Sequence, residues 1–321
     1  MFRLRFDLRV PPFSTVTHSQ QYQEMLAMVR YADEHGFMAA TLSEHHGTDD
    51  GFMSSPIVIG GAILAASKKM FCMVACMLFP YHDPLRLAED IAAVDLMAPG
   101  RFSVVAGLGY RPEEFEMFGK DRKRRAADFE AILDAMFQAW TGEEFVHHGR
   151  RARVRPIPAS NPRQLLIMGG AAEVSARRAA RYRLAYMPPI NDPTLGDAYH
   201  DEARKVGFET PFLMMGEGPG LVLVTEDPDK LWATIGDNLL YDQMAYSGWQ
   251  TADNRTSWDV KATSLDDLRR SSQYAIVTPD ECVELMRATG SVGIHPLVGG
   301  IDPAIGWESL ELCVNKVMPR L

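Results

Sequence analysis

Three histidines fall in two short polar segments, residues 43–46 (SEHH) and residues 80–82 (PYH). Imidazole gains and loses protons near neutral pH, which suits histidine to act as a general acid or base. The two segments therefore predict proton transfer as the chemistry of this chain. The same histidines can instead be hydrogen-bonded structural residues, and the sequence leaves this alternative open for each of them.

Metal binding is a second use for Glu44, His45, His46 and His82. Neighbouring side chains on an extended segment point to opposite faces, so His45 and His46 are poorly placed to share one ion. The spacing at which a helix presents carboxylate and histidine ligands to zinc is also absent. We therefore predict no metal site.

Glycine-rich segments form the second group of candidates. Gly107, Gly109 and Tyr110 follow one apolar run, and residues 169–171 (Gly169, Gly170, Ala171) follow another. Backbone N–H groups at glycines can approach an anion closely where a helix begins, and the helix dipole adds to the attraction. Residues 169–170 thus indicate phosphate binding, although glycine is also common in tight strand-to-helix turns. No GxGxxG follows the first apolar run, and the P-loop and hydrolase-elbow patterns are absent.

The elements that must position these residues alternate along the chain. Short apolar runs of β-type residues are each followed by helical periodicity, which is typical of a parallel sheet with crossover helices. The predicted strands are about residues 4–10, 38–42, 71–79, 102–106, 165–168, 184–187, 221–225 and 292–298. Eight such units predict one (β/α)8 TIM barrel, an α/β fold, as a single domain over residues 1–321. Its active site is expected at the carboxyl ends of the strands.

Three segments add to this repeat. Residues 144–154 predict a hairpin with Gly149 near its turn, and residues 248–277 predict an irregular insertion before the last strand, of the kind that often forms a lid. The helix after Pro56 has a face of small residues, Gly60, Gly61, Ala62, Ala65 and Ala66. Such a face packs either on its own barrel or on a second copy of the chain.

Composition narrows the class of protein. A net charge of -9 argues against nucleic acid and anionic membrane as partners. No apolar run approaches the roughly 18 residues of a membrane-spanning helix, and the first residues predict a strand instead of a signal peptide. The four cysteines lack metal spacing and predict buried thiols in a reducing compartment. We expect a cytoplasmic enzyme, in which the basic run 120–125 is either a solvated helix start or an anion contact.

Longer segments resemble the bacterial luciferase-like flavin-dependent oxidoreductases. Residues 82–119 (HDPLRLAEDIAAVDLMAPGRFSVVAGLGYRPEEFEMFG) are similar to the central segment of that family, and residues 41–47 (TLSEHHG) to its motif after the second strand. Residues 162–182 (PRQLLIMGGAAEVSARRAARY) are similar to its fifth strand and phosphate turn. The resemblance covers nearly the whole chain. It implies a (β/α)8 barrel with an insertion before the last strand, which residues 248–277 match.

The resemblance also implies a cofactor and roles for single residues. Family members bind reduced FMN, or a 5-deazaflavin hydride carrier, at the carboxyl ends of the strands. His45 matches the family's catalytic base, and Glu44 and His46 match its neighbours. From their place after the strands, the candidate cofactor-binding residues are Gly107, Gly109, Tyr110, Gly169, Gly170 and Ala171. The candidate substrate-positioning residues, at the end of the third strand, are Phe79, Tyr81 and His82.

Two positions depart from the family pattern. Bacterial luciferase has a Cys-Arg pair after strand four, where this chain has Gly107 and Leu108, so that arginine contact to phosphate has no counterpart. Members often have Ser or Thr after strand five, where this chain has residues 169–172 (GGAA). Backbone amides, with Ser175 or an arginine, must then hold the phosphate.

The leading interpretation is a monooxygenase that uses reduced FMN and O2 on a small to medium apolar organic substrate. A separate flavin reductase would supply the reduced FMN, and the resemblance implies a homodimer. A deazaflavin-dependent oxidoreductase that transfers hydride without oxygen insertion is the first alternative, since the acidic tail of that cofactor suits the basic residues Lys120, Arg122, Lys123 and Arg124. A flavin-binding protein without turnover is the second.

Overall fold

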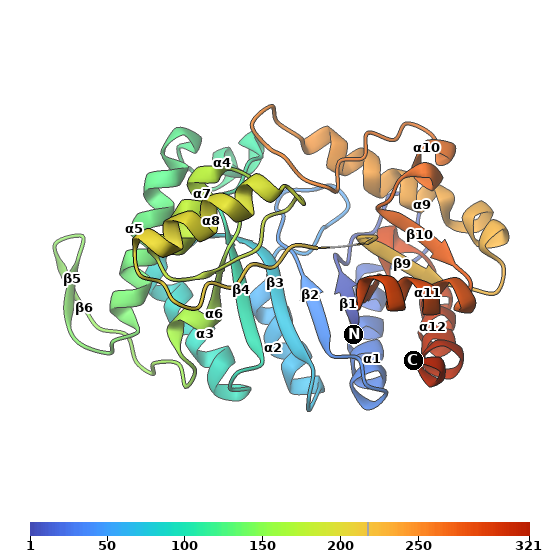
Figure 1. The fold of residues 1–321 in the computed structure, drawn as a ribbon, viewed down its shortest axis with the longest axis horizontal. Coiled ribbons are helices and arrows are strands. Elements are labelled where there is room, and N and C mark those ends of the chain that lie inside the picture. The colour runs from blue at the N-terminus through green and yellow to red at the C-terminus, as the bar shows by residue number, and fades with distance from the viewer. Residues whose placement is uncertain (217) are drawn as a thin grey trace.

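A computed structural model describes residues 1–216 and 218–321 and shows a parallel sheet of nine strands with helices packed around it (Figure 1). The order across the sheet is β10-β9-β11-β1-β2-β3-β4-β7-β8. The strands are β1 (Phe2–Phe6), β2 (Ala39–Leu42), β3 (Phe71–Leu78), β4 (Phe102–Gly107), β7 (Leu166–Met168), β8 (Ala185–Tyr186), β9 (Leu221–Val224), β10 (Tyr274–Val277) and β11 (Val292–Ile294). In the described part of the chain the hydrogen-bonded ladder ends at β8 and β10, and Leu213 forms a single parallel bridge to Tyr186.

Helices follow the strands as predicted. They are α1 (His18–Glu34), α2 (Pro56–Ala66), α3 (Pro84–Met97), α4 (Pro112–Met117), α5 (Arg125–Ala139), α6 (Pro162–Leu165), α7 (Glu173–Arg181), α8 (Pro193–Lys205), α9 (Pro228–Trp249), α10 (Leu265–Arg270), α11 (Pro279–Thr289) and α12 (Pro303–Leu312). Many begin with a capping residue and then proline. Asp83, for example, accepts hydrogen bonds from the backbone N–H groups of Leu85 and Arg86, which confirms the predicted start of α3. None of the described helices is long and apolar enough to cross a membrane.

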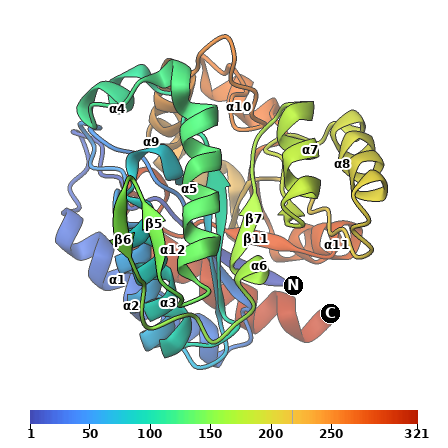
Figure 2. The ribbon, with the colours of Figure 1, turned by 90° about the vertical axis from the view of Figure 1, so that its left-hand side faces the viewer.

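All eight predicted strands are present, and the predicted hairpin is β5 (Phe145–His147) with β6 (Arg150–Ala152), beside α5 (Figure 2). Gly149 at its turn has a φ of 74°, which a side chain would disfavour. The prediction that residues 248–277 are irregular throughout was wrong. That range contains the end of α9, all of α10, and β10, which pairs in parallel with β9. Residues 274–277 (YAIV) are an apolar run like those of the other strands, but they directly follow a polar stretch that was assigned to an insertion.

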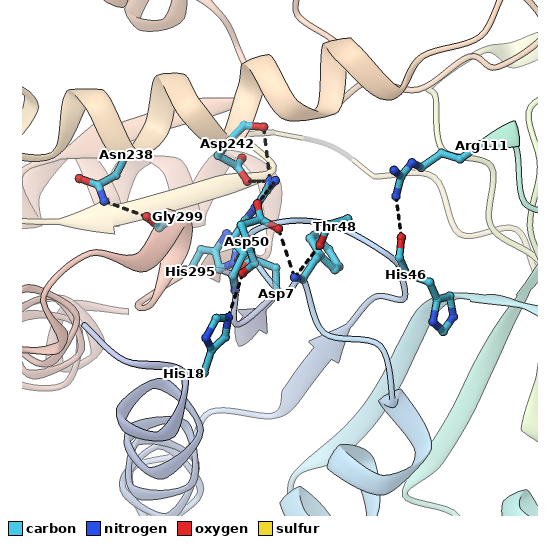
Figure 3. Close-up of polar contacts among 12 residues, drawn as sticks. Asp7, His18, His46, Thr48, Asp50, Arg111, Asn238, Asp242, His295 and Gly299 are labelled. Carbon is cyan, nitrogen blue, oxygen red and sulfur yellow. Dashed lines mark hydrogen bonds and ion pairs between the residues drawn. The ribbon is translucent and has the colours of Figure 1, made fainter. Parts of the chain in front are cut away.

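The sheet positions the site because parallel strands end at one common edge. One face of β1 (Phe2, Leu4 and Phe6) is buried in the main core, while Arg3 and Arg5 on the other face are half-buried. Helix α9 lies across the carboxyl ends of β11 and β1. Asn238 contacts Gly299 after β11, and Asp242 contacts Arg9 after β1. Figure 3 shows these contacts along the helix. The last turn of α9 then reaches the segment after β2.

Candidate active site

Glu44, just after β2, is the centre of a buried hydrogen-bond cluster. Its Oε1 accepts from His46 Nε2 at 3.0 Å and from His82 Nε2 at 2.8 Å, and its Oε2 accepts from the backbone N–H of Leu78 at 2.5 Å. Burial opposes ionisation of this carboxyl group. The three donors outweigh burial and lower the pKa of Glu44 to about 2. Glu44 is therefore a carboxylate that joins the segments after β2 and β3.

His45 points away from this cluster and pairs with Glu114 of α4. His45 Nδ1 lies 2.9 Å from Glu114 Oε1. The same oxygen accepts from the backbone N–H of His46 at 3.0 Å and from Arg111 Nη1 at 3.1 Å, and the Tyr81 hydroxyl donates to Oε2 at 3.3 Å. Burial raises the pKa of Glu114, but hydrogen bonds from His45 and His46 and the charge of Arg111 lower it overall, so it is ionised at neutral pH.

The Glu114 carboxylate decides which nitrogen of His45 carries the proton. Burial lowers the pKa of His45 below its ordinary value despite the opposing effect of Glu114, so the ring is neutral at pH 7. An ionised carboxylate only accepts hydrogen bonds, so Nδ1 must be the donor. The other nitrogen, Nε2, then carries a free lone pair. This tautomer is the one that a general base requires.

Aromatic rings enclose His45. Its ring centroid lies 4.8 Å from that of Trp249, 5.0 Å from Phe52, 5.8 Å from Tyr110 and 6.1 Å from Tyr246. His45 is only 6% exposed as a result. A reacting group can therefore reach Nε2 only where one of these rings moves. Trp249 and Tyr110 are half-buried, whereas Phe52 and Tyr246 are buried.

A buried arginine binds α9 next to the chamber that these four aromatic rings form around His45. Arg9, which follows β1 and is fully buried, donates to Asp50 Oδ2 at 2.7 Å and to Asp242 Oδ1 at 2.7 Å. Asp242 also accepts from the Tyr274 hydroxyl at 2.7 Å. The Arg9 guanidinium lies over the Trp249 ring, 5.1 Å from its centroid. Because removal of one partner would leave a buried charge uncompensated, this network holds α9 over the site.

Close contacts explain the glycines after β4 and β7. A Cβ on Gly107 would lie 2.7 Å from Cys76 Sγ, and one on Gly109, whose φ is 71°, would lie 2.8 Å from the Tyr81 hydroxyl. Gly170 has a φ of 113°, and its Cβ would lie 2.6 Å from Ser175 Oγ. The N-cap residue of α7, Ala172, offers no side-chain acceptor. The first turn of α7 thus presents backbone N–H groups beside a glycine turn, an arrangement that suits an anion.

Two side-chain contacts join helices α7 and α5. Arg178 of α7 donates to Glu130 of α5 at 2.6 Å, and Tyr182, one turn later, donates to Asp134 at 2.8 Å. Both pairs are 48 residues apart in sequence, so the first residues of the two helices lie at the same level. The start of α5 carries Arg125, with Arg122 just before it. Arg122 Nε donates to the backbone carbonyl of Tyr110, whose ring lies beside His45, so this part of the basic run 120–125 reaches the edge of the site. Arg122 and Arg125 are half-buried, whereas Lys123 and Arg124 are exposed.

The structure brings most of the predicted site residues together. Glu44, His46 and His82 form one cluster, and His45, Tyr81 and Tyr110 surround or contact the Glu114 pair. Phe79 lies apart: it is fully buried and its ring packs on Phe129 of α5, 5.7 Å away. Its role beside the substrate stays a prediction, since no contact joins Phe79 to the residues around His45.

Glu114, Arg111 and Arg9 are not among the site residues predicted from the sequence. Glu114 lies in a short helix beside the equally acidic Glu113, and nothing in the sequence distinguishes the two. The signal that could have found it is its place soon after the glycines of β4, within the family-like segment 82–119. Among residues 1–216 and 218–321 no group of three or more His, Cys, Asp or Glu side chains is arranged to hold a metal ion.

The sequence of this chain matches a known protein family and several curated proteins. A model of the luciferase-like monooxygenase family matches residues 6–295. The alkanal monooxygenase alpha chain of the Kryptophanaron alfredi symbiont is 36% identical over 89% of each chain. That of Photorhabdus luminescens is 30% identical over 97% of this chain and 94% of the relative. Other curated relatives match over shorter segments, which span between 32% and 53% of their own length.

Solved structures confirm the predicted fold class. Monooxygenase RslO1 from Streptomyces bottropensis has a TM-score of 0.75 at 22% identity and covers 99% of both chains. The oxygenating constituent of 3,6-diketocamphane monooxygenase from Pseudomonas putida, in complex with FMN, has a TM-score of 0.70 at 17% identity over 100% of this chain and 98% of its own. An F420-dependent secondary alcohol dehydrogenase has a TM-score of 0.71 at 16% identity over 98% of both.

Proposed function

The chain belongs to the luciferase-like monooxygenase family, and we propose that it is a monooxygenase that uses reduced FMN and O2 on a small to medium apolar organic substrate. The observation that carries the proposal is the His45–Glu114 pair, a neutral histidine whose free Nε2 faces a chamber of aromatic rings. A base of this kind has no use in a protein that only binds flavin. The pair therefore favours an enzyme over a flavin-binding protein without turnover.

The residues fit an FMN phosphate at the mouth of the site. The Gly169-Gly170 turn and the uncapped start of α7 offer backbone N–H donors, and Arg122 and Arg125 offer positive charge at the same level. Arg122 also donates to the backbone carbonyl of Tyr110 at 3.0 Å, which links the phosphate end of the site to the ring beside His45. These groups replace the luciferase arginine that has no counterpart at Leu108.

When bound, reduced FMN would supply two electrons, so that one oxygen atom of O2 enters the substrate and the other leaves as water. The part of this chain is proton transfer and the exclusion of water. His45 Nε2 accepts a proton from the reacting group, and Glu114 stabilises the imidazolium that results. Phe52, Tyr246 and Trp249 keep the chamber apolar and exclude water. This lining also supports an apolar substrate.

Hydride transfer with a deazaflavin is the alternative function. The same arginines would suit the acidic tail of that cofactor, and the F420-dependent structure matches the fold as well as the monooxygenases do. Titration with reduced FMN and with the deazaflavin, each followed by flavin fluorescence without oxygen, separates the two. We expect tighter binding of reduced FMN, and oxygen consumption in the presence of a flavin reductase that regenerates it. Exclusive binding of the deazaflavin would overturn the proposal in favour of hydride transfer.

We also infer a homodimer. Helix α2 has no polar side chain, and its outer face exposes Val58 and Ala65 beside Met97 of α3. Val58 is 70% exposed and Met97 62%. An exposed apolar face with small residues allows a second helix to approach closely, and a second copy of the chain has the same face to offer.

A further inference from the structure

The segment after α9, residues 250–262, crosses the mouth of the site as a strap that is held at both sides. On one side Asp253 binds Arg122 Nη2 and Arg125 Nη2, each at 2.5 Å. On the other side the Ser257 backbone N–H donates to the Pro189 carbonyl at 3.0 Å, and Arg255 binds Asp192 at 3.0 Å. The strap thus joins the start of α5 to the segment after β8.

The carboxylate of Asp253 has the chemistry of the ligand that the two arginines would take. It presents one oxygen to each guanidinium, as two oxygens of a phosphate would. Hydrogen bonds from Arg125, Thr251 and Arg122 hold the pKa of Asp253 well below its ordinary value, so this group is an anion at any physiological pH. Arg122 and Arg125 are therefore an anion clamp that the chain itself occupies.

The last residue of α9, directly before the strap, lies at the other end of the site. Trp249, four residues before Asp253, presents its aromatic ring to His45 at 4.8 Å and lies under Arg111 at 4.5 Å. Between them the chain leaves α9 and makes a turn, in which the Asn254 backbone N–H donates to the Thr251 carbonyl at 3.0 Å. One continuous stretch of chain thus places an aromatic ring beside the base and an anion in the clamp, the two features that FMN joins through its ribityl chain.

We propose that residues 249–253 are an internal stand-in for the cofactor, in which Asp253 takes the place of the phosphate and Trp249 the place of the ring. A phosphate monoester enters by displacing Asp253, which releases the strap and with it Trp249. This inference rests on the proposed function, because it takes the clamp as the phosphate site. It adds that the free enzyme is closed by its own chain and that phosphate alone is sufficient to release the strap.

The test compares Asp253→Asn with Arg255→Gln, a control that removes the ion pair with Asp192 on the other side of the strap and leaves the clamp untouched. Binding of inorganic phosphate and of FMN is measured by calorimetry at constant ionic strength. Because each half-exposed ion pair contributes up to about a factor of five, Asp253→Asn should bind both ligands roughly 3- to 30-fold more tightly than wild type. It should also show a steeper loss of affinity with salt, since phosphate no longer replaces an existing ion pair. Arg255→Gln should stay within about twofold of wild type.

Trypsin gives an independent readout, because the strap contains two cleavage sites, Arg255 and Lys261, and Lys261 is present in every variant compared. Phosphate should speed cleavage there in wild type, whereas Asp253→Asn should be cut quickly without phosphate. Equal affinity of Asp253→Asn and wild type, or an equal gain in Arg255→Gln, would overturn the proposal. Arg125→Ala separates the failure of this inference from the failure of the proposed phosphate site. If Arg125→Ala weakens FMN binding while Asp253→Asn changes nothing, the clamp binds phosphate but Asp253 does not act as its substitute. If it leaves FMN binding intact, the clamp is not the phosphate site and both fail.

Discussion

Replacement of Glu114 by glutamine tests whether this carboxylate sets the tautomer of His45. A glutamine amide can present its NH2 group to Nδ1, which would move the histidine proton to Nε2 and remove the free lone pair. A hydrogen bond to a charged partner contributes about 1.5–3 kcal/mol, which corresponds to roughly 10- to 150-fold in the fraction of correctly protonated His45. We therefore expect kcat to fall by at least about tenfold in Glu114→Gln, with the glutamine still filling the same space.

The pH profile shows whether the loss has this cause. Catalysis by a base requires neutral His45, so in wild type kcat/KM should fall on the acid side with a midpoint below the ordinary histidine pKa of about 6.5. Burial lowers the pKa of His45 and the Glu114 charge raises it, so removal of that charge moves the acid limb to still lower pH. An unchanged midpoint would mean that the acid limb does not report the protonation of His45, which would contradict its role as the base.

Glu113→Gln is the matched control, since Glu113 lies on the same turn of α4 and is exposed. It should leave turnover, the pH profile and the melting temperature unchanged. Turnover of Glu114→Gln within threefold of wild type would refute the reasoning, and so would a loss that FMN affinity and melting temperature account for in full.

Three further predictions concern other parts of the chain. His45→Ala should lower turnover by roughly 100- to 10,000-fold while FMN affinity and melting temperature stay near wild type, and turnover within threefold would contradict a catalytic role. Glu44→Gln should cost about 3 kcal/mol of unfolding free energy at pH 7, from a pKa of about 2 against 4.5 unfolded. Because the pKa of Glu44 is lowered in the folded chain, its contribution to stability is complete above pH 4.5 and disappears as the pH falls toward 2. Denaturant unfolding at pH 7 and at pH 3 measures this. The difference in unfolding free energy between variant and wild type should be smaller at pH 3. Gly61→Leu should weaken a homodimer in light scattering without unfolding the chain, since its Cβ would meet Met97 and Val94 only at 3.6 and 3.8 Å; a monomeric wild type would rule the dimer out.

The sequence by itself determined the alternation of strands and helices and the edge at which the polar residues meet. Apolar runs with regular spacing report burial directly, and a proline after a capping residue, as at Asp83, marks a helix start because of local geometry alone. Residues that follow parallel strands must gather at one edge, so Glu44, His46 and His82 could be expected near one another before their contacts were known.

Only the tertiary structure decided what His45 touches and what covers it. Glu114 lies 69 residues away from His45 in the sequence. The rotation of α4 about its axis decides that Glu114, and not its neighbour Glu113, contacts His45. The path of α9 over the strand ends depends on Arg9, Asp50 and Asp242, three buried charges that come from distant parts of the chain. Periodicity records which side of an element is buried. It does not record which distant side chain is packed against that side, because this pairing follows from the three-dimensional placement of the elements.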